Sequence, residues 1–265
     1  MTGPVPDASH VPSLLMRQTL LDRELVKAAE QPVLRLLPWL DVVVIGGTAI
    51  IDRGPEIIRP LVEEVRGALR GRKLLILTGA GIRARHVLGV GLDLGLPTGA
   101  LSALAATEAE MNGHMIAALL AADGVSYIPH GTVARQLATH LAACPAVVSN
   151  AYPPYGPYEF PTAAGRIPSH RTDAGALLLA DALGARTLIY VKDVDGIHDE
   201  TGRARTRVPA SAVLGSNGSP VDRLAPELLG RAKHMREFQI INGLVRGALP
   251  AALDGETVGT VVHVG

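Results

Sequence analysis

The sequence alternates short apolar, β-branched runs with stretches whose apolar residues recur at helical spacing. The run at 42–45 ends at a glycine pair, and helical spacing then covers 55–69. A second apolar run at 74–77 is again followed by small residues. Strands that alternate with helices in this way are joined by crossovers into a parallel sheet with helices on both faces. The chain is therefore predicted to be α/β: a three-layer sandwich with a central, mainly parallel sheet.

The same alternation divides the chain into an arm and one domain. Residues 1–34 mix prolines and polar residues around a short helical stretch and are predicted to form an N-terminal arm, whereas 35–265 are predicted to form one α/β domain. The Pro- and aromatic-rich stretch at 150–171 predicts an irregular loop, and the Arg-, Gly- and Ser-rich stretch at 199–222 predicts a mobile flap. Further strands are expected at 125–128, 146–149, 187–191, 239–241 and 258–262, and further helices at 103–121, 132–142, 172–183 (capped by Thr172) and 224–238.

Composition limits the partners that the chain can have. Lys plus Arg and Asp plus Glu both number 25, so the formal net charge is zero and no positive field gathers nucleic acid or an anionic membrane. No run of about 18 or more apolar residues predicts a membrane span. The single Cys144 excludes a multi-cysteine metal site and fits a cytoplasmic location. With 48% hydrophobic and 19% charged residues, burial of surface between subunits, and so an oligomer, is expected.

Two loops of small residues are the first candidates for a binding site. Gly46-Gly47 and Gly79-Ala80-Gly81 each follow an apolar strand and precede a helix. Backbone N–H groups in such loops can approach phosphate oxygens without obstruction by a Cβ atom, so the two loops together indicate a polyphosphate. Either loop alone is more often only a tight turn. Neither is a P-loop or a complete dinucleotide-binding motif.

Charged residues follow the strand predicted at 187–191. Lys192 is the lysine best placed near phosphates, and one or two carboxylates with phosphate oxygens are enough to hold Mg²⁺. The acids could equally form turns or stabilise a helix N-terminus, and an arginine after the second glycine loop could belong to a solvated helix face. The candidates in these segments are Asp173, Lys192, Asp193, Asp195, Gly196 and Arg83.

His130 and His140 are the candidate metal-binding residues. They lie across a strand-to-helix loop and the following helix and could point into one cavity. A protonated imidazole can donate to oxometalate oxygens, and a neutral one can bind a metal. The alternative for each is a partly buried histidine that is hydrogen-bonded to the backbone.

Six ordered motifs resemble the amino acid kinase family, which includes carbamate and uridylate kinases. The resemblance covers about residues 36–263 and implies the fold of that family and binding of ATP with Mg²⁺. It implies that the glycine loops hold the transferred phosphoryl group, that Asp173 organises the site, and that the loop around Asp193–Gly196 meets the nucleotide. The motifs are the first strand with Gly46-Gly47, TGAG at 78–81, RTDAGALLLADALGA at 171–185, VKDVDGI at 191–197, QIINGL at 239–244 and Gly259-Thr260.

Within this family, the chain resembles the branch that stores molybdate or tungstate, and in particular its alpha-type subunit. The resemblance implies a hexamer, built from one chain or with a sister subunit, that binds ATP and holds polyoxometalate clusters. It makes His140, and less directly His130, a candidate ligand of such clusters. The segments that carry it are RLLPWL at 35–40, DRG at 52–54, LLILTGAGIRARHV at 74–87, GVSYIPHGTVARQLATHL at 124–141 and INGLVRG at 241–247.

Two positions depart from the family pattern. The family has a lysine, which neutralises charge on the transferring phosphoryl group, where this chain has Val44, so at most weak ATP hydrolysis is expected. The alpha-type storage subunit has histidines after P-P-Y, whereas Gly156-Pro157-Tyr158 follow here. A kinase for a nucleoside monophosphate or an acyl phosphate is the alternative function, and a catalytically weak pseudo-kinase subunit is a third.

Overall fold

The structure is a computed structural model that describes residues 34–152, 166–168, 170–199, 201–214 and 219–265. Arg35–Gly265 form one compact unit. Almost all of the expected N-terminal arm, and most of the irregular loop expected at 150–171, lie outside the described residues, including the departure at 156–158. The division into an arm and a domain therefore stays a prediction. Within the described ranges, no helix is long and apolar enough to span a membrane.

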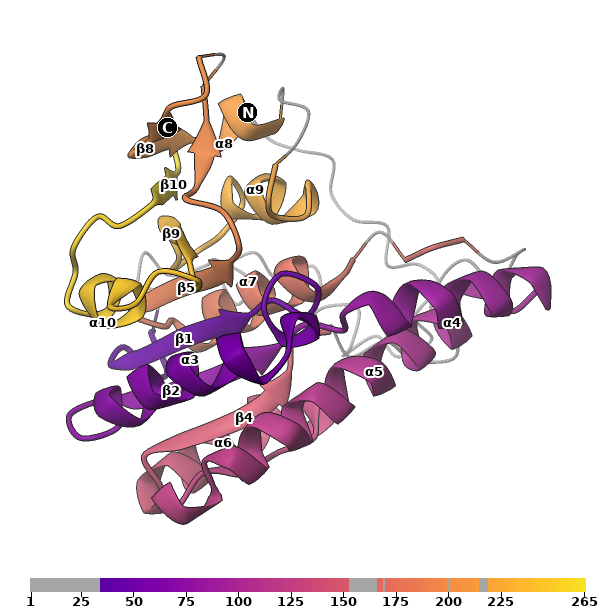
Figure 1. The fold of residues 1–265 in the computed structure, drawn as a ribbon, viewed down its shortest axis with the longest axis horizontal. Helices are drawn as coiled ribbons and strands as arrows, with labels where there is room; N and C mark the ends of the chain where they lie inside the picture. Colours follow the sequence, from indigo (N-terminus) through magenta and orange to yellow (C-terminus); the bar gives the residue numbers. More distant parts are fainter. Residues whose placement is uncertain (1–33, 153–165, 169, 200, 215–218) are drawn as a thin grey trace, which may run out of the picture. The chain divides into compact units, whose positions relative to one another are not determined.

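An eight-stranded sheet forms the centre of the described unit (Figure 1). Its strand order is β3-β4-β2-β1-β5-β9-β10-β8. Neighbouring strands are parallel except β9 and β10, which are antiparallel, so the predicted mainly parallel sheet is confirmed. The strands are β1 (Leu40–Ile45), β2 (Lys73–Thr78), β3 (Ser126–Tyr127), β4 (Ala146–Asn150), β5 (Thr187–Lys192), β8 (Arg207–Pro209), β9 (Glu237–Asn242) and β10 (Thr260–His263), beside an antiparallel pair of β6 (Ile197–His198) and β7 (Ala204–Arg205).

Helices cover both faces of this sheet, as alternate residues of β1 show. Val42 and Val44 belong to the core that includes α6, α7 and α9, whereas Val43 and Ile45 belong to the core that includes α3, α5 and α10. Because successive side chains of a strand point to opposite faces, a strand buried on both faces has a continuous apolar sequence. The three layers are confirmed. The helices are α3 (Pro55–Ala68), α4 (Ile82–Asp93), α5 (Thr98–Leu119), α6 (His130–Ala143), α7 (Thr172–Leu183), α8 (Ala210–Leu214), α9 (Leu224–Leu229) and α10 (Ala248–Leu253), with short 3₁₀ turns η1 (Ile51–Arg53) and η2 (Ala121–Asp123).

The helix expected at 224–238 is much shorter than predicted. α9 ends at Leu229, and the chain then leads into β9. The carboxylate of Asp181, on α7, accepts hydrogen bonds from the backbone N–H groups of Lys233, His234 and Met235, at 3.1, 2.6 and 2.9 Å respectively. These bonds replace the helical bonds that the segment would otherwise make. A side chain from another element therefore overrides the local helical pattern.

The flap expected at 199–222 is mostly regular structure in its described part. β8 joins the sheet as a parallel neighbour of β10, and α8 follows it. Val208 and Val213 are buried in the main core. β8 and α8 are only three and five residues long, which is too short for the spacing of apolar residues in the sequence to indicate a strand or a helix. The prediction of a mobile flap was therefore wrong for this part of the segment.

Candidate functional site

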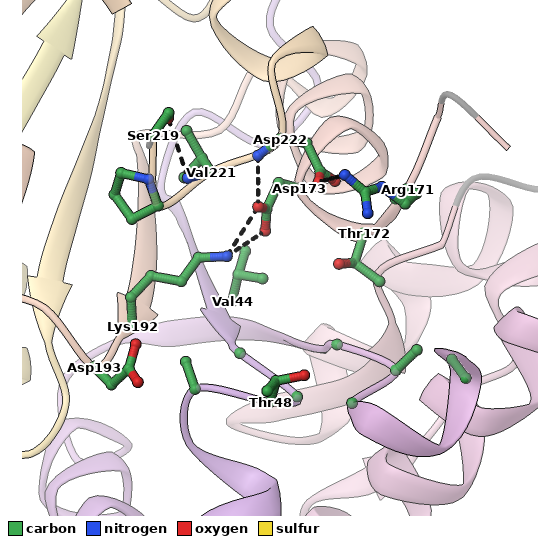
Figure 2. A pocket seen from close by; sticks show the side chains of 18 of the residues that line it. Val44, Thr48, Arg171, Thr172, Asp173, Lys192, Asp193, Ser219, Val221 and Asp222 are labelled. Atoms are coloured by element: carbon green, nitrogen blue, oxygen red, sulfur yellow. Dashed lines mark hydrogen bonds and ion pairs between the residues drawn. The ribbon is translucent and has the colours of Figure 1, made fainter. Parts of the chain in front are cut away.

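A cavity of about 770 Å³ lies at the carboxyl ends of β1, β2 and β5 (Figure 2). Parallel strands bring their following loops to one edge of the sheet, where ligands of α/β proteins bind. The two glycine loops, the start of α7 and the residue that ends β5 line the cavity, as does a segment before α9, Ser219–Arg223. The structure thus brings together eight of the predicted site residues: Gly46, Gly47, Gly79, Ala80, Gly81, Asp173, Lys192 and Asp193.

The two glycine loops touch each other through their backbones. A Cβ atom on Gly47 would lie 2.1 Å from the backbone nitrogen of Gly81, and one on Gly79 would lie 2.5 Å from the backbone nitrogen of Gly47. Gly81 also has a positive φ of 80°. No side chain fits at these positions, so the glycines are required by the packing of the loops as well as by any phosphate that approaches them.

Lys192 and Asp173 form a largely buried ion pair at the cavity. The Nζ atom of Lys192 donates to Oδ1 and Oδ2 of Asp173, at 2.9 and 2.8 Å. The hydroxyl of Tyr190, two residues before Lys192 on β5, donates to the backbone carbonyl of Asp173 at 2.6 Å. Asp173 lies in the first turn of α7.

The N-cap of α7 is Arg171, and its side chain makes no capping hydrogen bond. The expected cap by Thr172 is therefore wrong, because Thr172 is already the first helical residue.

Asp222 is a site residue that sequence reasoning missed. Its backbone N–H donates to Oδ2 of Asp173 at 3.0 Å, and its carboxylate lies 2.6 Å from the Arg171 guanidinium. Burial and the neighbouring charge of Asp173 raise the pKa of Asp222 to about 6, while Arg171 and Lys192 oppose the rise. No motif points to Asp222, because it lies in the segment that the sequence predicts to be a flap. Figure 2 shows Asp222, Asp173 and Lys192 converging on one wall of the cavity.

Three predicted nucleotide ligands do not line this cavity. Arg83 turns toward α5, where its guanidinium donates to Glu108 at 3.0 Å and to Asn112. Asp195 accepts a hydrogen bond from Asn242 at 2.7 Å. Gly196 has a φ of 119°, and a Cβ atom there would lie 2.2 Å from the hydroxyl oxygen of Thr260. The contacts seen for these residues are thus with other parts of the fold, and their contact with a nucleotide stays a prediction.

His130 and His140 lie in different places on α6. His130 is the first residue of the helix and largely buried; its Nδ1 atom lies 2.7 Å from the carbonyl oxygen of Asn150, and burial lowers its pKa. At a rise of 1.5 Å per residue, His140 lies about 15 Å further along the helix axis. Neither lines the cavity described above. In the described part of the chain, no group of three or more His, Cys, Asp or Glu side chains is arranged to hold a metal ion.

Val44 lies in the cavity wall at the end of β1. Its side chain is 1% exposed and belongs to the core on the α7 face of the sheet. It therefore presents methyl groups to the cavity and no charge (Figure 2). Arg85, Arg171 and Arg223 also line the cavity, so its cations come from the last residue of β5 and from the starts of α4, α7 and α9.

Comparison with known proteins agrees with this architecture. Residues 40–213 match the amino acid kinase family. Over 263 residues the chain is 40% identical to the molybdenum storage protein subunit beta of Azotobacter vinelandii, covering 96% of this chain and 97% of that protein. The chain belongs to the amino acid kinase family. The expected likeness to an alpha-type subunit is not confirmed, because this relative is a beta subunit.

Two solved structures show the same fold. The uridylate kinase of Archaeoglobus fulgidus superposes with a TM-score of 0.63 at 22% identity, covering 84% of this chain and 99% of that one. The UMP kinase of Bacillus anthracis also has a TM-score of 0.63, at 18% identity, covering 85% of this chain and 96% of that one. The amino acid kinase-like α/β sandwich predicted from the sequence is confirmed.

The chemistry of the cavity suits a chain of phosphates. Lys192 supplies a cation at one end, the touching glycine loops supply backbone without side chains, and Asp173 and Asp193 supply carboxylates. Asp193 is held by Arg53, at 2.5 Å, and Asp173 by Lys192. Phosphate oxygens with one or two such carboxylates form the ligand set that Mg²⁺ prefers. Val44 adds no cation to this lining.

Proposed function

We propose that this chain is a subunit of an oligomeric storage protein for molybdate or tungstate, and that it binds ATP with Mg²⁺ in the cavity between the glycine loops, Asp173 and Lys192. The observation that carries the proposal is this cavity on a chain that is 40% identical to a molybdenum storage subunit over nearly its whole length. Polyoxometalate clusters, with His140 and His130 among their ligands, belong to the same proposal, as does a hexamer of one or two kinds of chain.

The proposed roles follow from the contacts in the cavity. Lys192 neutralises phosphate charge while Asp173 keeps its ammonium group in place. The glycine loops bring backbone N–H groups to the phosphates. Asp173 or Asp193, together with phosphate oxygens, would hold Mg²⁺, which would screen the phosphate charge. Val44 leaves the transferring phosphoryl group without the lysine that the family resemblance implies at this position, so ATP is bound more effectively than it is hydrolysed.

The experiment that tests this proposal measures nucleotide and metal separately. Calorimetry should give Mg-ATP binding in the micromolar to millimolar range. Elemental analysis after incubation with molybdate or tungstate, with and without Mg-ATP, should give many metal atoms per chain, and light scattering should give an assembly larger than a dimer. ATP binding without retained metal would point instead to a kinase or a pseudo-kinase subunit. An absence of both would overturn the proposal.

The pseudo-kinase function is the second candidate, and Val44 is the observation that favours it. A subunit with a formed nucleotide cavity but without the family lysine can contribute assembly and cavity walls while a sister subunit performs the chemistry. Metal retention only when a lysine-containing sister chain is co-expressed would support this candidate. Retention by this chain alone would exclude it.

A further inference from the structure

Asp52 contacts the second glycine loop from outside the cavity lining. It belongs to η1, the short turn that follows the first glycine loop. Its Oδ2 atom accepts a hydrogen bond from the backbone N–H of Ile82 at 2.5 Å, and a Cβ atom on Gly81 would lie 2.7 Å from the same oxygen. The Asp52 side chain is 14% exposed. Its carboxylate is therefore packed against the beginning of α4.

This carboxylate occupies a position that a phosphate would favour. α4 is a 12-residue helix whose N-cap, Gly81, makes no side-chain capping bond and whose first turn has no acidic residue. The free N–H groups and the dipole of a helix N-terminus stabilise an anion. Asp52 supplies that anion from another element, since one first-turn N–H group is already bonded to it.

The cavity continues along α4 beyond this point. Ala84, Arg85 and Leu88 line it, together with Tyr152, so there is room for a second ligand beside the polyphosphate. A phosphorylated second ligand in this part would place its phosphate near the start of α4 and meet the negative charge of Asp52 there. The guanidinium of Arg83 lies 3.9 Å from Asp52 but is also bonded to Glu108. Arg85 lines this part of the cavity and supplies a positive charge further along the helix, so the charge that a phosphate meets at the start of α4 itself is that of Asp52.

We propose that Asp52 is a specificity-determining residue that excludes a second phosphorylated substrate from the nucleotide cavity. With Asp52 at the N-terminus of α4, the cavity binds one polyphosphate chain and discriminates against a nucleoside monophosphate. This inference rests on the proposed function, because it concerns what the same cavity accepts besides ATP.

The test compares wild type with Asp52→Asn and Asp52→Ala, using UMP as the probe. Asparagine keeps an oxygen that accepts the Ile82 N–H bond and removes only the charge, whereas alanine removes both. Calorimetry on the full chain, with saturating Mg-ATP and without nucleotide, should show UMP binding at least about tenfold tighter in Asp52→Asn than in wild type, a difference of about 1.4 kcal/mol. Uridine, which has no phosphate, should bind all three proteins equally.

A matched control removes one negative charge elsewhere. Glu63→Gln, on the exposed surface of α3, makes the same change in net charge and should leave UMP binding as in wild type. Wild-type binding of UMP as tight as that of folded Asp52→Asn would overturn the proposal, and so would an equal gain for uridine. If ATP binds to none of the proteins, the proposed function fails, and inorganic phosphate binding by the same variants still decides the role of Asp52. If Asp52→Ala does not fold, Asp52→Asn decides alone.

Discussion

The ammonium group of Lys192 lies 2.9 and 2.8 Å from the two carboxylate oxygens of Asp173, in a pair whose side chains are only 13% and 6% exposed. Lys192 ends β5 and Asp173 begins α7, so the pair joins the sheet to the helix that covers it. A buried ion pair adds little net stability, but removal of one partner leaves an uncompensated charge. The pair therefore holds a cation next to the glycine loops before any phosphate is present.

Replacing Lys192 by Met should weaken ATP binding by at least about tenfold, because a charged hydrogen bond to phosphate is worth about 1.5–3 kcal/mol. The variant should also lose about 3 kcal/mol of unfolding free energy, since Asp173 is left buried without its partner. Calorimetry and urea denaturation measure the two effects. Adding Asp173→Asn should restore stability but not ATP affinity. Unchanged ATP affinity in the single variant would exclude Lys192 from the phosphate site.

Replacing Val44 by Lys should raise ATP hydrolysis at least about tenfold, because one preorganised charge near a transferring group is typically worth 10² to 10³ in rate. ATP affinity should change less, since the glycine loops and Lys192 remain. Phosphate release under saturating Mg-ATP is the measurement, with Val44→Met as an uncharged control. A folded Val44→Lys variant that binds ATP without gaining activity would favour the pseudo-kinase function.

Replacing Gly47 by Ala should destabilise the protein strongly, because its Cβ atom would overlap the backbone of Gly81. Gly67→Ala is the matched control: it lies within α3 with nothing near the added methyl group, and it should stabilise by up to about 1 kcal/mol. Thermal unfolding without nucleotide compares the two. Equal stability of both variants would mean that the glycine loops can separate.

Replacing Asp222 by Asn should stabilise the nucleotide-free protein more at pH 7 than at pH 4. The pKa of Asp222 is raised from 3.8 to about 6 in the folded state, so the folded protein holds this proton more tightly than the unfolded chain. The resulting contribution to folding stability is complete below pH 3.8 and is lost as the pH rises through about 6. Asparagine does not titrate. Because one pKa unit corresponds to about 1.4 kcal/mol, the stability difference between variant and wild type should grow by on the order of 2 kcal/mol over this range. Denaturant titrations at several pH values, with a metal chelator present, measure this stability difference. A difference that does not change with pH would contradict the raised pKa of Asp222.

Replacing His140 by Ala should reduce retained molybdate or tungstate while leaving ATP affinity unchanged, because His140 lies outside the nucleotide cavity. His86→Ala, on the exposed side of α4, is the matched control. Elemental analysis of both variants after incubation with molybdate or tungstate measures the retained metal. Unchanged metal content in His140→Ala would mean that this histidine is an ordinary helix residue.

The sequence predicts the parallel part of the fold well because each element there carries its own signal. The apolar run of β1, the small residues after β2 and the helical spacing of α3 are local, and parallel topology then brings their ends to one edge. The same argument places Asp173 and Lys192 at that edge, since both lie at element ends next to it, whereas their ion pair is seen only in the structure.

The rest of the site could not be predicted because its determinants are distant in sequence. Asp222 is held at the cavity by its contacts with Asp173 and Arg171, and Asp52 reaches α4 from a turn thirty residues earlier. Arg83, in contrast, is predicted from the sequence to lie at the site and does not line the cavity. It follows a glycine loop in sequence, but Glu108 and Asn112 on α5 turn its guanidinium away from the cavity.

The direct backbone contact between Gly47 and Gly81 changes what a glycine motif means in a chain of this fold. Two loops whose backbones are in direct contact need glycine at the contact, whether or not a phosphoryl group binds between them. Val44, the last residue but one of β1, adds no charge to the cavity that these loops line. The glycines of this chain are therefore explained first by the packing of two loops against each other, and their contact with a phosphoryl group stays a proposal.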